Sequence, residues 1–493
     1  MKRCASSFLL SLSTALVVGH NGPAAAGPWI DPGNVILRDD IQLLADAGLI
    51  RAPVTTWPLS WGDIVQDIAN NSGMSLGPGE KQALLRLRRA EQIATKTEQI
   101  KLRASASLSS EPRTLRTFRG TPRESAEVSV NAAWTGLRFT YRLQVTGVAD
   151  PEDDRSARAD GSYFGVVLGN YMLSFGQMDR WWGPGWEGSL ILSTNARPIP
   201  AIALRRNFSE PFKTKWLRWM GPWTTSLVWG QLEGGRSVPN ARFFGARLNF
   251  RPTVNLEIGL ARTAQWCGSG RPCGLDTFTD LLLGQDNLGE NTVLSDEPGN
   301  QLAGVDWRWR VPVRWPVAWY GQVIGEDEAG NLPSRMIGQL GVETWAYNRR
   351  FAGVMRGHLE FADTAAEFYK DQVRYDFAYR HNIYLDGYRY RDRSIGHAMD
   401  NDGRMISAGV TLDTDSGDQW RGLFRIVDLN RGGTEVNPVA ASSLDLMNLE
   451  LGYTRVLVGG ELDIGIGVDR VEDWMTTKDE TEFRAHITWQ SDL

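Results

Sequence analysis

The chain has 493 residues and a formal net charge of −5, and 42% of its residues are hydrophobic and 23% charged. This composition excludes a disordered chain. A polytopic helical membrane protein would need several runs of roughly 18 or more apolar residues, but only one apolar stretch of note, 8–18, is present. The 20 Trp, 17 Phe, 12 Tyr and 52 Gly favour strands and turns. We therefore expect an all-β protein, and no nucleic-acid partner.

The N-terminus has the pattern of a secretory signal peptide. Lys2 and Arg3 precede the apolar run 8–18, and three small residues at 24–26 precede Gly27. We predict a signal peptide over 1–26 and hence an exported protein.

Two cysteines remain after that segment. Cys267 and Cys273 lie in a Gly/Pro-rich stretch of a chain expected to be exported, which favours a local disulfide. A zinc site would need further ligands, and none is nearby.

Residues 27–98 show a helical period interrupted by breakers. A first helix is expected from Asp39 to Gly48, and a second over 61–68 with Ser60 as its N-cap. A third is expected to start at 78–80 and run towards Glu98. We predict a small helical bundle, which could hardly form a hydrophobic core alone.

After Glu98 the period changes from 3.6 to 2 and stays there to the C-terminus. One hairpin is expected from 127–132 and 137–145 around Thr135 and Gly136, and another from 244–250 and 254–260 around Arg251 and Pro252. Further alternating runs give roughly 16 to 18 strands: 99–108, 163–168, 171–178, 223–231, 302–310, 317–324, 337–346, 351–361, 405–413, 420–428, 446–456, 461–469 and 482–490.

Alternation alone fits both a soluble sandwich and a membrane barrel, which differ in the solvent that meets the apolar face. The signal peptide, the number of strands and their length of about 9 to 11 residues favour the barrel. The run 482–490 alternates close to the C-terminus, where a barrel must close. We predict an all-β transmembrane barrel over 99–493 with about 18 antiparallel strands.

The sequence lacks most motifs that are typical of enzymes and metal sites. The chain lacks H-E-x-x-H and a phosphate-binding Gly-Lys-Ser/Thr loop. The segment 400–403, Asp-Asn-Asp-Gly, has the look of a calcium loop, but Ala398 and Gly409 stand at the first and twelfth ligand positions. A solvated turn is the better interpretation. No carboxylate pair for glycoside hydrolysis stands out, so we expect no catalytic residues, no metal and no cofactor.

Two segments interrupt the alternation and combine aromatic rings with polar groups. Sugars stack their C–H faces on such rings, and their hydroxyls bond planar donors and acceptors. The alternative for 177–200 is that its Trp residues form interfacial girdles or fill the lumen. The alternative for 380–402 is a folded-in loop whose side chains satisfy each other. The candidate glycan-binding residues are Asp179, Arg180, Trp181, Trp182, Trp186, Glu187, Asn195 and Arg197 in the first segment and His381, Asn382, Tyr384 and Tyr388 in the second.

Several of these pieces resemble the Wzi family of capsule assembly proteins. The matching stretches are 37–48, 56–61, 180–200 and 381–402, in order along nearly the whole mature chain. The resemblance implies an outer-membrane barrel of about 18 strands in a Gram-negative bacterium, with a helical bundle on the periplasmic side. It also implies a lectin-like, non-catalytic role: binding capsular or related exopolysaccharide and helping to attach it at the cell surface.

Other functions stay open at this point. An outer-membrane porin or polysaccharide export conduit is the main alternative, since a barrel with a polar inner face could be open. The expected partners are the polysaccharide and outer-membrane lipid, with contact to export machinery a further option, and we expect a monomer. The sequence does not indicate whether the helices fill the lumen.

Overall fold

The structure is a computed structural model that describes residues 28–274, 276–279, 299–329, 332–457, 459–473 and 478–492. The predicted signal peptide over 1–26 lies outside the described residues. Within them, antiparallel strands form one closed barrel of 18 strands, with the two-residue β7 (Ala157–Arg158) as an additional short pairing. The last strand, β25, pairs with the first, β4, so the sheet has no free edge. The predicted barrel of about 18 antiparallel strands is confirmed.

The barrel strands are β4 (Lys101–Ser109), β5 (Ala126–Thr135), β6 (Phe139–Ala149), β8 (Tyr163–Leu168), β9 (Tyr171–Gly176), β11 (Ala201–Arg206), β12 (Trp223–Gln231), β13 (Arg242–Thr253), β14 (Leu256–Trp266), β15 (Gly299–Arg310), β16 (Val317–Ala329), β17 (Leu332–Asn348), β18 (Gly353–Asp363), β21 (Arg404–Thr414), β22 (Asp418–Leu429), β23 (Leu444–Leu457), β24 (Gly460–Asp473) and β25 (Lys478–Asp492).

Two details differ from the sequence expectation. The short strand β11 was not expected, because its inward-facing Ala201 and Ala203 are apolar and the segment shows no apolar–polar alternation. The hairpin turn predicted at Arg251 and Pro252 is wrong, since β13 continues to Thr253 and β14 begins at Leu256. A register shift between Phe250 and Thr253 lets β13 carry Pro252, which has no N–H for the ladder.

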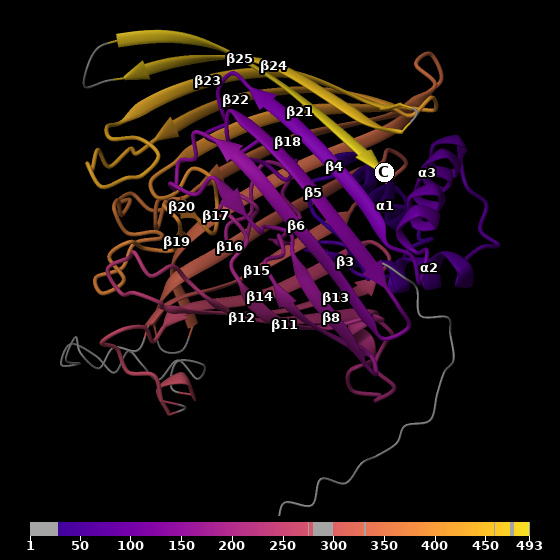
Figure 1. Ribbon diagram of the computed structural model, residues 1–493, viewed down its shortest axis with the longest axis horizontal. Helices are drawn as coiled ribbons and strands as arrows, with labels where there is room; N and C mark the ends of the chain where they lie inside the picture. The colour runs from indigo at the N-terminus through magenta and orange to yellow at the C-terminus, as the bar shows by residue number, and fades with distance from the viewer. Residues whose placement is uncertain are drawn as a thin grey trace, which may run out of the picture.

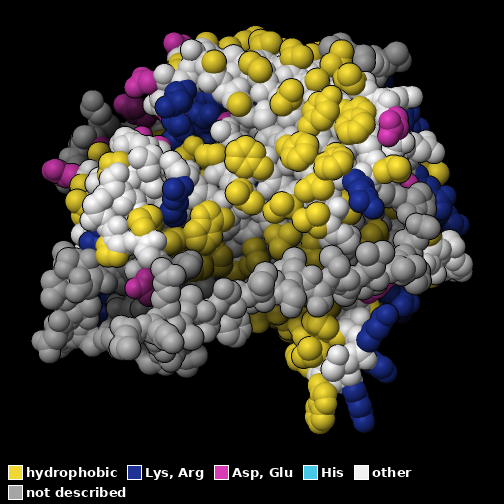
Figure 2. All heavy atoms as spheres, turned by 60° about the horizontal axis from the view of Figure 1, so that its bottom comes forward, with side chains coloured by type: hydrophobic (Ala, Val, Ile, Leu, Met, Phe, Trp, Pro, Cys, Tyr) yellow, Lys and Arg dark blue, Asp and Glu magenta, His cyan; other side chains and the backbone are white. Residues whose placement is uncertain are grey.

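The two faces of the barrel wall differ in polarity, and the apolar face is outside. On β22, Phe424 and Ile426 are exposed, while Arg425 between them is buried. The Arg425 guanidinium donates to Asn448 Oδ1 at 3.0 Å and to Glu450 Oε1 at 2.9 Å across the inner face. Figure 2 shows hydrophobic side chains spread over the middle of the outer surface, with most Lys and Arg towards its ends. Such a surface requires lipid outside, which decides between sandwich and barrel.

The three predicted helices are present, but the first begins earlier than expected. α1 (Val35–Asp46) starts after Asn34, whose side chain accepts from Leu37 N, so it begins four residues before the expected Asp39. α2 (Trp61–Asn70) is capped by Ser60, and α3 (Pro78–Ala94) starts at Pro78. None of the described helices has the length and apolar character needed to cross a bilayer.

The barrel has two unlike ends (Figure 1). The helices and the end of β25 lie at the end where most strand connections are short, such as those between β13 and β14 and between β21 and β22. The opposite end carries long connections over 110–125, 177–200 and 364–403. Outer-membrane barrels have short periplasmic turns and longer extracellular loops, which supports the prediction that the helices are periplasmic. We call the two ends the helix end and the loop end.

Candidate functional site

The 177–200 loop leaves β9 and turns into the barrel before returning to β11. Its short strand β10 (Trp181–Trp182) pairs with β2 (Thr56–Trp57) from the N-terminal region. Trp181 and Trp182 are 0% exposed, and Trp181 packs edge-on against Phe118 at a centroid distance of 5.4 Å. In this structure neither ring has a free face for a sugar.

Trp186 lies further along the same loop and is hydrogen-bonded to the barrel wall. Its indole Nε1 donates to Glu343 Oε2 at 3.0 Å, and its backbone N donates to Glu360 Oε2 at 2.9 Å. The Arg38 guanidinium from α1 covers the ring at 3.9 Å, and the ring stacks on His358 at 5.7 Å. A hydrogen-bonded ring between two stacked neighbours is fixed in place.

Charged members of the loop are also paired. Arg197 makes a bidentate pair with Asp160 at 2.7 and 2.8 Å, and Glu187 Oε1 lies 3.1 Å from His358 Nε2. Burial lowers the pKa of Arg180 to about 10. Asp179 is half-exposed and lines a narrow hollow together with Arg180 and Arg197.

The 364–403 loop packs onto the 177–200 loop through tyrosine hydroxyls. Tyr379 Oη donates to Leu190 O at 2.6 Å, and Tyr388 Oη donates to Ile191 O at 2.8 Å. Tyr384 Oη donates to Cys267 O at 3.1 Å, and Cys267 and Cys273 form a disulfide. All three tyrosines are fully buried, so they hold the loops to each other and to the wall.

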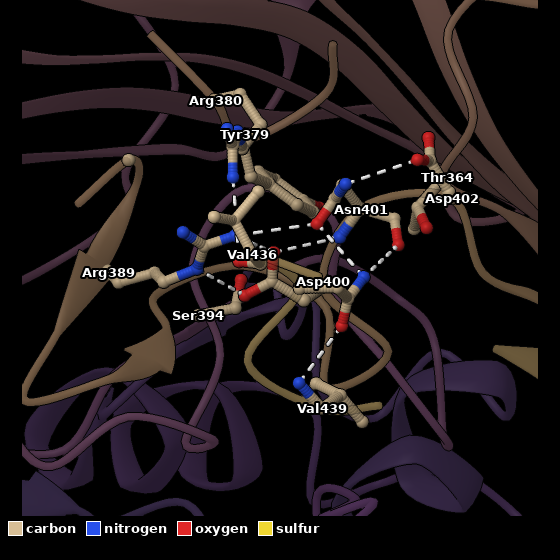
Figure 3. A network of polar contacts seen from close by, with 12 residues as sticks. Thr364, Tyr379, Arg380, Arg389, Ser394, Asp400, Asn401, Asp402, Val436 and Val439 are labelled. Atoms are coloured by element: carbon tan, nitrogen blue, oxygen red, sulfur yellow. Dashed lines mark hydrogen bonds and ion pairs between the residues drawn. The ribbon is translucent and has the colours of Figure 1, made fainter. Parts of the chain in front are cut away.

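The segment 400–402 lies at the centre of a buried network (Figure 3). Arg389 of β19 (Arg389–Tyr390), which pairs with β20 (Arg393–Ser394), makes a bidentate pair with Asp400 at 2.6 and 2.7 Å. Asn401 Nδ2 donates to Asp402 Oδ2 at 3.1 Å, and all three residues of the segment are 0% exposed. The prediction of a solvated turn is therefore wrong, because long-range partners bury these polar groups.

The 110–125 loop fills the remaining space from the loop end. Phe118 is 0% exposed and contacts Trp57 and Trp181 edge-on. Its backbone N donates to Trp186 O at 3.2 Å. Three loops from one end therefore interlock inside the lumen.

Helix α1 enters the lumen from the other end and is tied to the wall by ion pairs. Asp46 accepts from Arg308 Nη2 of β15 at 2.8 Å, and Asp39 pairs with Arg356 of β18 at 2.6 Å. Arg38 Nη2 donates to Pro184 O and Gly185 O at 2.6 and 2.8 Å. The helix thus joins the barrel wall to the 177–200 loop.

The division of the chain into a helical part, 27–98, and a barrel part, 99–493, stays a prediction, but the two parts pack closely.

A second group of aromatic and basic side chains lies exposed on the outer side of the 364–403 loop. Tyr369 is 58% exposed and Tyr375 is 44% exposed. The side chains of Lys370 and Arg374 are each 53% exposed and share Glu367. We call Tyr369, Lys370, Arg374 and Tyr375 the outer patch. Sequence reasoning missed this patch, although two tyrosines and two cations close together in 369–375 could have indicated it.

The twelve predicted glycan-binding residues thus fall into two groups. Asp179, Arg197 and His381 are half-buried and Asn382 is exposed, so they are within reach of solvent. Burial lowers the pKa of His381 to about 4, so its imidazole is neutral at pH 7. The buried group consists of Arg180, Trp181, Trp182, Trp186, Glu187, Asn195, Tyr384 and Tyr388. Contact of either group with a glycan stays a prediction.

The fold and the filled lumen define the class of the protein: it is an outer-membrane β-barrel of the Gram-negative type. The family model for capsule assembly protein Wzi matches residues 99–485. The chain therefore belongs to the Wzi family of capsule assembly proteins.

Two relatives show how far the similarity extends. An uncharacterized 55.8 kDa protein in the cps region of Klebsiella pneumoniae is 32% identical over 431 residues, covering 85% of this chain and 81% of the relative. The solved structure of Wzi from Escherichia coli is described as an outer membrane protein involved in group 1 capsule assembly and a carbohydrate-binding β-barrel. It shares 27% identity with a TM-score of 0.82, covering 94% of this chain and 99% of that one.

Proposed function

We propose that this protein binds capsular or related exopolysaccharide at the cell surface and helps to attach it there without chemistry on the polymer. The support comes from family membership and from the description of the Escherichia coli structure as a carbohydrate-binding barrel. The observation that carries the proposal is that inward-folded loops fill the lumen while an aromatic and basic patch remains exposed at the loop end.

The proposal divides the predicted residues by their burial. The buried group, with Trp181, Trp182 and Trp186, holds the interlocked loops in shape. The glycan contacts come from the outer patch together with the solvent-accessible group of Asp179, Arg197, His381 and Asn382. Tyrosine faces stack on sugar C–H groups, and guanidinium and amide groups bond hydroxyls or carboxylates.

The outer patch can be tested with purified full-length barrel in detergent micelles and polysaccharide from the producing strain. A Tyr369→Ala/Tyr375→Ala variant removes the two exposed ring faces, and we expect at least tenfold weaker binding. The matched control, Arg350→Ala/Phe351→Ala, removes a cation and an exposed ring at the helix end and should bind as wild type. Wild-type binding by the patch variant would refute the placement of the site.

The conduit alternative makes a different prediction. Among the described residues, segments from both ends occupy the lumen, which favours a closed barrel over an open path. We expect no steady single-channel conductance in planar bilayers. Stable open channels from the wild-type protein would favour the conduit.

A further inference from the structure

The connection between β11 and β12 carries an unusual exposed stretch at the helix end. Residues 213–219 are all exposed and read Lys-Thr-Lys-Trp-Leu-Arg-Trp, with three cations and no acid. Trp216 is 84% exposed and Trp219 is 62% exposed. Large apolar side chains exposed together need a partner surface.

This stretch lies against the outer face of the barrel. Trp219 packs edge-on against Phe250 of β13 at a centroid distance of 5.7 Å. Asn249, beside Phe250, points into the lumen, where its Nδ2 bonds Thr55 Oγ1 at 2.9 Å. Since neighbouring strand residues face opposite sides, Phe250 faces outward. Trp219 therefore covers the side of the wall that meets lipid.

The start of the connection adds to the same cluster. Phe212 stacks on Trp223 of β12 at a centroid distance of 4.3 Å, and the Arg206 guanidinium covers the Trp223 ring at 3.8 Å. These contacts order the root of the connection, while Lys213, Lys215 and the residues up to Trp219 project from it. We call 212–219 the rim segment.

We propose that the rim segment is a membrane-interface anchor that binds anionic phospholipid headgroups of the periplasmic leaflet. Tryptophan prefers the interface between headgroups and hydrocarbon, where its ring is apolar and its N–H can bond. Lys213, Lys215 and Arg218 supply positive charge beside those rings, which is complementary to phosphodiester headgroups. The segment is also continuous with the lipid-facing wall through Trp219 and Phe250.

The same rim continues around neighbouring strands. Trp315, in the turn between β15 and β16, is 74% exposed and follows Arg314. Phe351, between β17 and β18, is half-exposed with the Arg350 guanidinium 5.8 Å from its ring. The rim segment differs from these turns by its three cations, so it is the part expected to select charged lipid.

Headgroup selection can be tested by native mass spectrometry of the mature full-length protein released from mixed micelles. The probes are phosphatidylglycerol and phosphatidylcholine supplied at equal concentration. Each interfacial cation contributes about a fivefold preference for anionic lipid. Neutralising three in Lys213→Gln/Lys215→Gln/Arg218→Gln should lower phosphatidylglycerol retention by up to about 100-fold, with phosphatidylcholine retention unchanged.

The matched control neutralises three exposed cations on and beside α3, Lys81→Gln/Arg89→Gln/Lys96→Gln. It should retain phosphatidylglycerol as wild type does. Heat-modifiable migration on gels checks that each barrel is folded. Equal phosphatidylglycerol retention by both triple variants would overturn the proposal.

Depth in the bilayer provides a second measurement. A nitroxide on Leu217→Cys, in protein reconstituted into vesicles containing phosphatidylglycerol, should be accessible to oxygen and protected from a water-soluble paramagnet. Free access of the water-soluble reagent would overturn the anchor and favour a soluble acidic partner for this segment.

Discussion

Arg38 offers a direct test of how the lumen is filled, because its guanidinium joins α1 to the 177–200 loop. It donates to Pro184 O and Gly185 O and lies over the rings of Phe118 and Trp186 at 4.3 and 3.9 Å. Two hydrogen bonds from a charged donor contribute about 4 kcal/mol. Two cation–π contacts add about 2 kcal/mol.

Desolvation offsets part of this gain. Burial lowers the pKa of Arg38 from 12.5 to about 10, which corresponds to about 3 kcal/mol. The net contribution to holding α1 in the lumen is therefore about 3 kcal/mol. An Arg38→Ala variant should open α1 locally about 100-fold more often.

Hydrogen–deuterium exchange of the reconstituted barrel measures that opening. We expect faster exchange of amides in Val35–Asp46, with barrel strands such as β22 and β23 unchanged. Arg88→Ala, on the exposed face of α3, is the control and should leave α1 exchange unaltered. Unchanged exchange in α1 of Arg38→Ala would refute the reasoning, and so would a uniform rise throughout the barrel.

Two further predictions concern His397 and Gly188, which meet inside the lumen. Burial lowers the pKa of His397 from 6.5 to about 4. The folded state therefore favours the neutral imidazole, which contributes up to about 3 kcal/mol to the stability of the folded loops. This contribution is fully present above pH 6.5 and is lost as the pH falls from 6.5 to 4. Hydrogen–deuterium exchange of amides 394–403, corrected for intrinsic rates, should be faster at pH 5. The His397→Gln variant should abolish that increase. An equal increase in the variant would contradict the assignment of this pH dependence to His397. A Cβ on Gly188 would lie 2.0 Å from His397 Nε2, so Gly188→Ala should cost about 1–3 kcal/mol and speed exchange in 186–195. Gly235→Ala, whose Cβ meets nothing within 4 Å, is the control, and equal effects of the two would argue against close packing there.

The barrel could be predicted from the sequence because strand alternation is local. Phe424, Arg425 and Ile426 already indicate two unlike faces, and the predicted signal peptide and the strand number indicate which solvent meets them. β11 was not predicted because Ala201 and Ala203 on its inner face remove the apolar–polar alternation. The turn at Arg251 and Pro252 was misplaced because an irregular register can carry a proline inside a strand.

The interior of the barrel could not be predicted in the same way. The segment with Trp181, Trp182 and Trp186 stands out in the sequence, but its burial depends on partners far away in the chain. Trp186 bonds Glu343, 157 residues further on, and Arg308 bonds Asp46 across 262 residues. No local period encodes such pairs, so the burial of these rings could not be predicted from the motif.

The most direct test of polysaccharide attachment compares a deletion strain with the same strain carrying wild-type protein or the Tyr369→Ala/Tyr375→Ala variant. Outer-membrane fractionation confirms that each protein is present in the membrane, and cell-bound and released polysaccharide are then measured separately. The account predicts that polymer shifts from cell-bound to released in the deletion and in the variant, with total synthesis unchanged. Polymer that stays bound without the protein, or synthesis that stops altogether, would contradict it.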